Sequence, residues 1–207
     1  INYVESLVRE DEETTPYQIC QIHALVLRGI DDENAGQYRK TPVRIAGASH
    51  TPPDSWEVAR LMDEWGSWLM QAQTKDDMII LAALAHHRLV KIHPFVDGNG
   101  RTARLAMNLL LIKERYPPSV IEQIYRRQYY SVLAQADVGK EAPLVNFVAR
   151  AVERSLTLTL DATTPQSVSP PEDDAWIPLR EATKNGPYSQ EYLSLLARKG
   201  HLEAIKR

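Results

Sequence analysis

The chain has 207 residues, of which 43% are hydrophobic and 25% are charged, and its formal net charge is −3. These values are typical of a globular domain with a small appendage, and they predict no general attraction to nucleic acid or to acidic membranes. No apolar run approaches the roughly 18 residues that a membrane-spanning helix needs, and the first residues lack the pattern of a signal peptide.

The first predicted elements are amphipathic helices. The stretch "TTPYQICQIHALVLRG" predicts a helix with Thr15 as its N-cap, Pro16 in its first turn and Gly29 at its end. Cys20, the only cysteine, lies inside this helix and is expected to be a buried structural thiol, which favours a reducing, cytoplasmic location. A second helix is predicted over residues 54–72, where apolar residues recur at helical spacing.

The segment between these two helices has a different pattern. In "GQYRKTPVRIAGASHTPP" the β-formers Val43 and Ile45 flank Arg44, and a glycine and a pair of prolines follow. This pattern predicts a short β-hairpin or an extended flap. Its exposed backbone is suited to pairing with an extended peptide by strand addition, although an ordinary surface hairpin would have the same sequence pattern.

Further helices are predicted after this flap. Residues 77–92 and 100–115 are apolar nearly all round, so we expect them to pair at the centre of the domain. Another helix is predicted after "YPPS", with Ser119 near its cap, and a last one covers residues 143–160. Residues 161–175, "DATTPQSVSPPEDDA", have no periodicity and are predicted to be a linker.

Residues 176–207 form a separate predicted module. A short helix, a Gly-Pro turn, a second helix from Ser189 and the possible strand "HLEAIKR" together resemble the helix-turn-helix of excisionase or MerR-type winged modules. Six Lys and Arg face three Glu here, a net charge of +3, whereas the remainder of the chain carries −6. That asymmetry permits contact with DNA, and protein docking or dimerisation is the alternative.

The motif "HPFVDGNGRTAR", which begins at His93, interrupts the two central helices with a polar, glycine-rich turn. His93 is suited to accepting a proton near neutral pH, and Asp97 is an oxygen ligand of the kind that Mg²⁺ shares with phosphates. Residues Gly98–Gly100 let the backbone approach a ligand at a helix N-terminus, which attracts anions. Arg101 and Arg104 share one face there, and because the helix dipole disfavours cations at this end, they indicate a bound polyphosphate.

Other known sites with similar residues fit the motif less well. A calcium-binding EF-hand loop needs an oxygen ligand where Arg101 stands and a bidentate Glu where Asn108 stands, and the chain has no GxxxxGK[ST] phosphate loop. Taken singly, His93 at a helix end and Asp97 or Asn99 in a turn have ordinary structural explanations. Their combination in one turn favours a nucleotide site.

The motif is similar to the signature of the Fic family, HPFx(D/N)GNGRxxR, and it matches that signature at every fixed position. The resemblance extends over residues 1–160 and implies an all-α core with one β-hairpin flap, which transfers AMP from ATP to a Ser, Thr or Tyr hydroxyl of a target protein. It implies that His93 deprotonates this hydroxyl and that Asp97 holds Mg²⁺.

The resemblance also implies how the nucleotide and the target protein bind. For the phosphates, it assigns an anion hole to the backbone of Gly98, Asn99 and Gly100 with the Asn99 side chain, contacts to the inner phosphates to Arg101, and contact to the γ-phosphate to Arg104. By the same resemblance, Phe95 is an apolar anchor of the loop, and Val43, Arg44 and Ile45 dock the target. It also implies that Tyr130 and Asp137, with Tyr129 beside them, form a wall of the adenine pocket. The motif does not require His86, which is expected to pack in the core and not to bind a metal.

The sequence also bears on how the activity is inhibited and on which other functions are possible. Relatives carry an inhibitory helix with the motif (S/T)xxxE(G/N), and the nearest match here, "SLVRED" at Ser6–Asp11, ends in Asp. We therefore expect inhibition to come from a helix upstream of Ile1 or from a partner protein. Two other functions fit the same sequence: a Fic-fold enzyme that transfers another phosphate-containing group, and a DNA-binding regulator that senses a nucleotide.

Overall fold

The computed structural model describes residues 13–45, 50–72, 77–163, 178–184, 189–199 and 202. All regular secondary structure in these ranges is helical. The chain divides into two compact units, residues 1–163 and residues 164–207. The motif lies in the first unit, so the fold of that unit decides how the site is positioned.

Helix α2 (Pro16–Leu27) begins and ends where the sequence predicts. The Thr15 hydroxyl accepts a hydrogen bond from the Gln18 N–H at 3.4 Å, and the Gln18 side chain accepts one from the Thr15 N–H at 3.1 Å. This reciprocal pair satisfies two of the N–H groups that a helix N-terminus leaves free. Gly29 follows the helix with a φ of +74°, a conformation that glycine adopts without strain.

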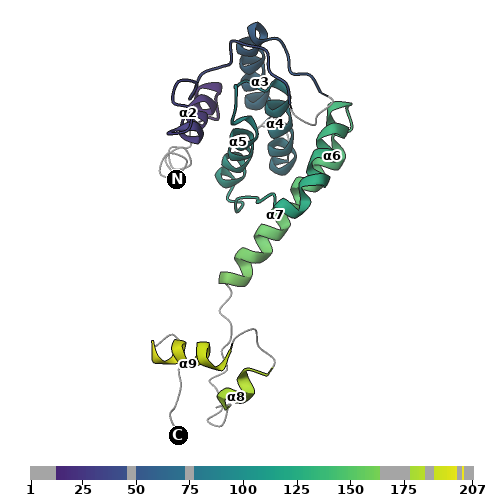
Figure 1. The fold of residues 1–207 in the computed structure, drawn as a ribbon. Coiled ribbons are helices and arrows are strands. Elements are labelled where there is room, and N and C mark those ends of the chain that lie inside the picture. The colour runs from purple at the N-terminus through teal and green to yellow at the C-terminus, as the bar shows by residue number, and fades with distance from the viewer. Residues whose placement is uncertain are drawn as a thin grey trace. The chain divides into compact units, whose positions relative to one another are not determined.

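Helices α4 (Met78–Ile92) and α5 (Asn99–Lys113) form the centre of the unit and lie side by side (Figure 1). The Asp77 side chain caps α4 by accepting a hydrogen bond from the Ile79 N–H at 2.9 Å. Both helices bury residues on most of their circumference, as their uniformly apolar sequences predict. The turn between them, residues 93–98, contains the first half of the motif, and the first residues of α5 contain the second half.

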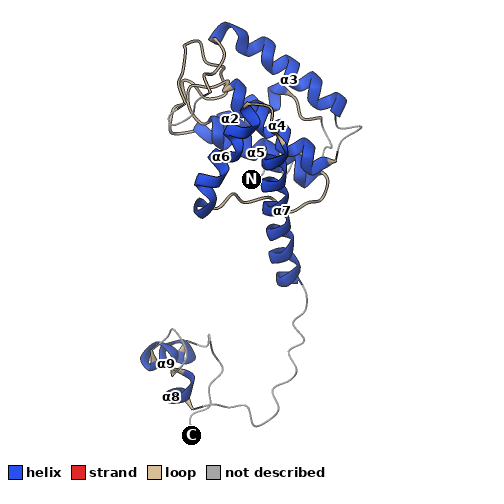
Figure 2. Cartoon of the chain, turned by 90° about the vertical axis from the view of Figure 1, so that its right-hand side faces the viewer, coloured by secondary structure: helices blue, strands red, loops and turns tan. Residues whose placement is uncertain are grey.

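Within the described residues, helices α2, α3, α6 and α7 surround this central pair (Figure 2). Helix α2 packs on α5 and α3, α3 and α7 pack on α4, and α6 packs mainly on α7. The bounds of these segments and of the two short 3₁₀ helices are η1 Ser55–Glu57, α3 Val58–Ala72, η2 Gln123–Tyr125, α6 Arg126–Asp137 and α7 Ala142–Thr163. The core between these helices contains large buried side chains from α2, α3, α4 and α5, among them Ile19, Met62, Leu81, Leu89, Met107 and Leu110.

The structure corrects two helix boundaries. Ser119 does not cap a helix, because its backbone N–H and C=O both pair with the Asn108 side chain, at 2.7 and 3.1 Å, and α6 begins only at Arg126. Helix α7 continues to Thr163 and so includes the first residues of the predicted linker at 161–175. An amide two turns inside α5 thus holds the "YPPS" segment in an irregular conformation.

The predicted β-hairpin is not seen in the residues that the structure describes. Val43, Arg44 and Ile45 have no regular secondary structure; Arg44 is exposed, and its two neighbours are half-buried. Residues 46–49, which would complete the hairpin, lie outside the described ranges. A strand needs a partner to satisfy its backbone, and Val43–Ile45 form no backbone pairing with any other residue that the structure describes.

The second unit contains helices α8 (Leu179–Ala182) and α9 (Gln190–Arg198), which contact each other. Ser189 caps α9 by accepting a hydrogen bond from the Tyr192 N–H at 3.2 Å, as its position in the sequence predicts. Apart from residue 202, the possible strand at 201–207 lies outside the described ranges. The helix-turn-helix and its contact with DNA therefore remain predictions.

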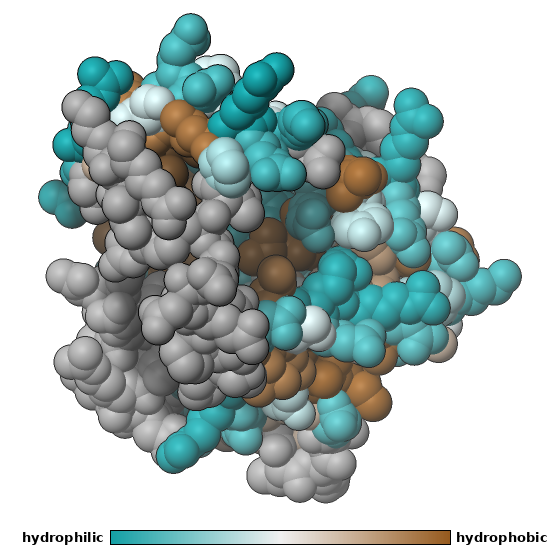
Figure 3. Space-filling model, turned by 90° about the horizontal axis from the view of Figure 1, so that it is seen from below, coloured by the Kyte–Doolittle hydropathy of each residue, from teal (hydrophilic) through white to brown (hydrophobic). Residues whose placement is uncertain are grey.

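Most of the described surface on the face shown in Figure 3 is hydrophilic, and its hydrophobic side chains form small patches. Larger exposed apolar side chains are scattered over the chain, for example Trp56, Ile124 and Leu158. None of the helices in the described ranges has the length and apolar composition that crossing a bilayer requires.

Candidate active site

His93 is the residue that ends α4. Its backbone adopts a left-handed conformation, with φ 53° and ψ 58°, and its N–H donates to the Leu89 carbonyl at 3.0 Å. Few residues other than glycine adopt this conformation, although histidine is among the more tolerant of them. Pro94 cannot continue the helix, so the chain turns here and the imidazole projects from the end of α4.

The His93 imidazole is prepared to accept a proton. Its Nδ1 lies 3.2 Å from the Val90 carbonyl, which can only accept a hydrogen bond, so Nδ1 carries the proton and Nε2 keeps a lone pair. Burial lowers the pKa of His93, and the charges of Arg39 and His50 act in the same direction, while the Val90 hydrogen bond and Asp97 oppose them. At neutral pH the side chain is therefore a neutral base.

This shift predicts how activity depends on pH. Only the neutral imidazole accepts a proton, and its pKa lies below the ordinary value of 6.5, so kcat/KM should be flat from about pH 7 to 8 and should fall as the pH drops below about 6.5. ATP binding by a His93→Ala variant over the same range controls for titration of the nucleotide. A decline that begins above pH 7 would contradict this assignment.

Asn99 closes the turn from the inside. Its side-chain oxygen accepts a hydrogen bond from the Phe95 N–H at 2.9 Å, and its side-chain nitrogen donates to the Phe95 carbonyl at 2.8 Å. Asn99 is 4% exposed and Phe95 is fully buried. The Asn99 amide therefore holds the loop with its oxygen and one of its two N–H groups. The role of its side chain and of its backbone in an anion hole stays a prediction.

That backbone begins α5. Gly98 precedes the helix with a φ of +76°, and the N–H groups of the first residues, Asn99 and Gly100 among them, have no partner within the helix. An added Cβ at Gly98 would lie 3.2 Å from the His23 ring, so both the backbone conformation and the available space require glycine here. The helix N-terminus is consequently free to bind an anion.

His23 packs against the inner side of the turn, a role that no local sequence pattern predicts. Its ring is fully buried and stacks on Phe95, with ring centroids 3.6 Å apart. The Gly36 N–H donates to Nδ1 at 3.0 Å, so Nε2 carries the proton and donates to the Asp97 carbonyl, also at 3.0 Å. Burial lowers the pKa of His23, which keeps this neutral tautomer in place. His23 thus fixes the backbone of the residue that is expected to bind the metal.

Arg39 connects the turn to the segment at 41–53. Its side chain is buried, and its Nε donates to the His93 carbonyl at 2.8 Å. The two terminal nitrogens donate to the carbonyls of Thr41, at 3.3 Å, and Pro53, at 2.5 Å. The backbone N–H of Arg39 also donates to the Pro94 carbonyl at 2.9 Å. One guanidinium therefore joins both ends of the predicted flap to the candidate base.

We expect Arg39→Met to destabilise the protein by about 2–3 kcal/mol, because three carbonyl oxygens lose a charged donor in a buried setting. Urea unfolding measures this change. Arg44→Met, a matched substitution at an exposed position of the same segment, should remain within about 0.5 kcal/mol of the parent. Equal stabilities for the two variants would contradict the role assigned to Arg39.

Asp97 and Arg101 form an ion pair at the mouth of the turn. Their side chains are 70% and 42% exposed, and an Arg101 terminal nitrogen lies 3.0 Å from an Asp97 carboxylate oxygen. The carboxylate is accessible to a cation, and no cluster of three or more metal-binding side chains occurs in the described ranges. A single exposed carboxylate suits Mg²⁺, which usually takes most of its other ligands from water and substrate phosphates.

Arg104 lies further along α5, and its side chain is turned toward the helix bundle. An added Cβ at Gly100 would be 3.4 Å from one of its terminal nitrogens, and its charge influences both His86 and Tyr129. Arg101 and Arg104 are thus held differently. The first pairs with a carboxylate at the surface, whereas the second is half-buried and its charge acts on the pKa of His86 and of Tyr129.

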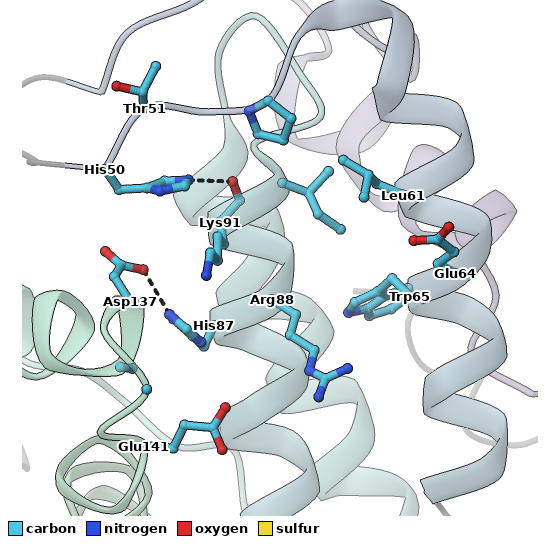
Figure 4. Close-up of a pocket in the computed structure, with 14 residues that line it drawn as sticks. His50, Thr51, Leu61, Glu64, Trp65, His87, Arg88, Lys91, Asp137 and Glu141 are labelled. Atoms are coloured by element: carbon cyan, nitrogen blue, oxygen red, sulfur yellow. Dashed lines mark hydrogen bonds and ion pairs between the residues drawn. The ribbon is translucent and has the colours of Figure 1, made fainter.

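The expected adenine-pocket residues lie in two different environments. Tyr130 is 52% exposed, and the Arg126 guanidinium lies 5.7 Å from the centroid of its ring. Asp137 pairs with His87 at 2.9 Å and lines a cavity of about 750 Å³ together with side chains from α3, α4 and the loop at 50–53 (Figure 4). Tyr130 does not line this cavity. Contact of either residue with adenine therefore remains a proposal.

This cavity lies next to the motif, but no motif residue lines it. Its wall includes Lys91 and Ile92, which immediately precede His93. His50, from the end of the predicted flap, lies with its Nε2 2.9 Å from the Lys91 carbonyl, as the dashed line in Figure 4 shows. Trp65 and Arg88 form the side toward α3. The cavity is thus large enough for a small organic group, and two of its lining residues immediately precede His93, the candidate base.

Residues 13–111 match the Fic/DOC family. The chain is 40% identical over 171 residues to the protein adenylyltransferase Fic of Drosophila grimshawi, an alignment that covers 81% of this chain and 35% of that protein. It is 41% identical over 159 residues to the protein adenylyltransferase Fic of Aedes aegypti, with 76% and 32% covered. The chain spans about a third of the length of these curated relatives.

Solved structures share the fold. A Fic domain containing signaling protein from Bacteroides thetaiotaomicron superposes with a TM-score of 0.71 at 28% identity, over 77% of this chain and 67% of that one. Fic-1 from C. elegans superposes with a TM-score of 0.70 at 33% identity, over 78% of this chain and 48% of that one. The likeness therefore covers most of the first unit.

Proposed function

We propose that residues 13–111, which match the Fic/DOC family, form a domain of that family, and that the protein transfers AMP from ATP to a hydroxyl side chain of a target protein. The observation that carries this proposal is the turn at residues 93–104, where a neutral imidazole, an accessible carboxylate, a free helix N-terminus and two guanidinium groups follow one another. The named activity of the curated relatives supports it.

In the proposed reaction, Nε2 of His93 takes the proton of a Ser, Thr or Tyr hydroxyl. The hydroxyl oxygen forms a bond to the α-phosphorus while the bond from that phosphorus to the oxygen bridging it to the β-phosphorus breaks. Pyrophosphate leaves with the bonding electron pair. Such a displacement needs in-line positioning and charge stabilisation more than covalent help from the protein.

The other motif residues would stabilise the phosphate charge. The free N–H groups at the start of α5 and the Arg101 guanidinium would bind the inner phosphates, and Arg104 would reach the γ-phosphate. Asp97 would hold Mg²⁺, which neutralises phosphate charge when bound. When a nucleotide binds together with its metal, the ion pair between Asp97 and Arg101 would break. Asp97 would then contact the metal, and Arg101 would contact a phosphate.

The target protein would bind along the segment that Arg39 anchors. Val43, Arg44 and Ile45 lie between the Thr41 and Pro53 carbonyls, to which the Arg39 guanidinium donates while it also holds the His93 carbonyl. An extended target segment pairing with this backbone would place its hydroxyl near the imidazole.

Labelled ATP tests the proposal. Incubation with α-labelled ATP, Mg²⁺ and a cell lysate should leave label on protein, and mass spectrometry should find an added AMP on a Ser, Thr or Tyr. Label that arrives only from γ-labelled ATP would replace AMP transfer by phosphate transfer. No label from either would favour a protein that senses the nucleotide without transferring it.

A further inference from the structure

The backbone of His93 is strained, and contacts that hold it come from a distant part of the chain. Its φ of 53° lies in the left-handed region, which costs free energy for a residue with a Cβ atom. Such strain persists only where the surrounding structure fixes it, and it is frequent at catalytic sites. Two residues at the ends of the predicted flap, Arg39 and His50, form hydrogen bonds on either side of this strained position.

Arg39 holds the chain on the side that follows the base. Its Nε donates to the His93 carbonyl at 2.8 Å, and its backbone N–H donates to the Pro94 carbonyl at 2.9 Å. The side chain is buried, and its terminal nitrogens donate to the Thr41 and Pro53 carbonyls. A planar guanidinium that serves three acceptors at once has little freedom to turn, so it fixes the orientation of these peptide groups.

His50 holds the chain on the side that precedes the base. Helix α4 ends at Ile92, so the Lys91 carbonyl has no N–H partner within the helix. Nε2 of His50 lies 2.9 Å from this carbonyl, which can only accept, so Nε2 carries the hydrogen. Figure 4 shows this bond running from the loop at 50–53 to the end of α4.

The His93 imidazole lies between these two contacts. Its Nδ1 bonds the Val90 carbonyl at 3.2 Å, and that bond is what leaves Nε2 free to accept a proton. The bond requires both the end of α4 and the strained backbone of His93 to stay in place. His50 acts on the first and Arg39 acts on the second.

We infer that His50 and Arg39 are positioning residues, which hold the end of α4 in the conformation that leaves Nε2 of His93 free to accept a proton from the target. The inference rests on the proposed function, because it takes His93 as the base and Val43–Ile45 as the docking segment. Both residues act through His93. The segment that receives the target would thus also position the base, so that correct docking and correct chemistry depend on the same contacts.

The first test replaces His50, a half-buried residue, with leucine. Transfer of α-labelled AMP to the proteins of a cell lysate, at saturating ATP and Mg²⁺, should fall roughly tenfold, because a displacement of about 1 Å can cost up to about a hundredfold in rate. The Kd for ATP should stay the same, because the proposed phosphate contacts lie on α5. His50→Gln, whose amide N–H can replace the donor at Nε2, should keep most of the rate.

Ser55→Ala is the matched control. The Ser55 hydroxyl donates to the Lys40 carbonyl at 3.1 Å, so this variant also removes one side-chain hydrogen bond from an end of the same segment, but none from the turn. It should transfer AMP at the rate of the parent. A loss as large as that of His50→Leu would make His50 a support of the segment alone and would overturn the inference.

Nitrogen NMR of the His93 ring, whose signal is identified by its loss in His93→Asn, gives a readout that needs no ATP. At about pH 8 the ring is neutral, and in the parent Nδ1 should carry the hydrogen. In His50→Leu and in Arg39→Lys, which lacks the planar fork, part of the population should move to the tautomer with its hydrogen on Nε2. An unchanged tautomer in both variants would overturn the inference, and so would an ATP affinity that falls as much as the transfer rate.

The same measurements separate this inference from the function on which it rests. If the parent transfers no AMP to any lysate protein, the proposed function is wrong, and the tautomer alone decides whether Arg39 and His50 hold the imidazole. If the parent transfers AMP and both variants keep its rate and its tautomer, the proposed function stands and only the positioning role fails.

Discussion

Replacing His93 with alanine should lower transfer of α-labelled AMP by about 10²–10⁴-fold, the contribution that a positioned general base makes. The substitution removes Nε2, the atom that keeps its lone pair because Nδ1 is bound to the Val90 carbonyl. The phosphate contacts lie on other residues, so ATP should still bind. Equal transfer rates for the parent and the variant would exclude His93 as the base.

The backbone of His93 requires a matched control. Its φ of 53° strains alanine, so a loss in His93→Ala could arise from a shifted turn. Asparagine tolerates this conformation well and cannot act as a base at neutral pH. His93→Asn should therefore lose as much activity as His93→Ala. A nearly active asparagine variant would assign the loss to the backbone and not to the chemistry.

Phe95→Ala should be the most destabilising single change in the motif, at about 3–5 kcal/mol. The ring is fully buried, stacks on His23 with ring centroids 3.6 Å apart, and lies 5.9 Å from the centroid of Tyr38. Its loss would leave a cavity directly beneath the turn. The free energy of unfolding from urea titration measures the effect.

Trp56→Ala is the matched control for Phe95→Ala, because it also removes an aromatic ring, from a side chain that is 76% exposed. It should change the free energy of unfolding by less than about 0.5 kcal/mol. The turn positions the base and the carboxylate, so Phe95→Ala should also lose nucleotide affinity under conditions where it remains folded. A stable Phe95→Ala variant with normal affinity would contradict the role of an anchor beneath the site.

Local signals in the sequence were sufficient to predict most of the helical core. Thr15 and Ser189 cap helices because their side chains accept hydrogen bonds from N–H groups three residues away, and such short-range chemistry can be read directly from the sequence. The predicted cap at Ser119 failed because Asn108, in the preceding helix, holds its backbone. The two cases differ in whether the partner is local.

The same difference separates the site residues that were predicted from those that were missed. The motif was recognisable because its groups follow one another along the chain. His23 and Arg39 act on Asp97 and His93 across 74 and 54 residues, and neither carries a local pattern that indicates such a contact. Nor could the sequence show that the Asn99 side chain pairs with the Phe95 backbone.

The exposed ion pair of Asp97 and Arg101 influences which ligands would bind to the free site. The two charges cancel, so neither a lone anion nor a lone cation gains much by approaching, and each would have to leave one member of the pair uncompensated. An exposed pair of this kind costs no more than about 1 kcal/mol to separate. A ligand that brings a cation for the carboxylate and an anion for the guanidinium satisfies both at once, so the proposed site would favour, by this small margin, a nucleotide already complexed with its metal.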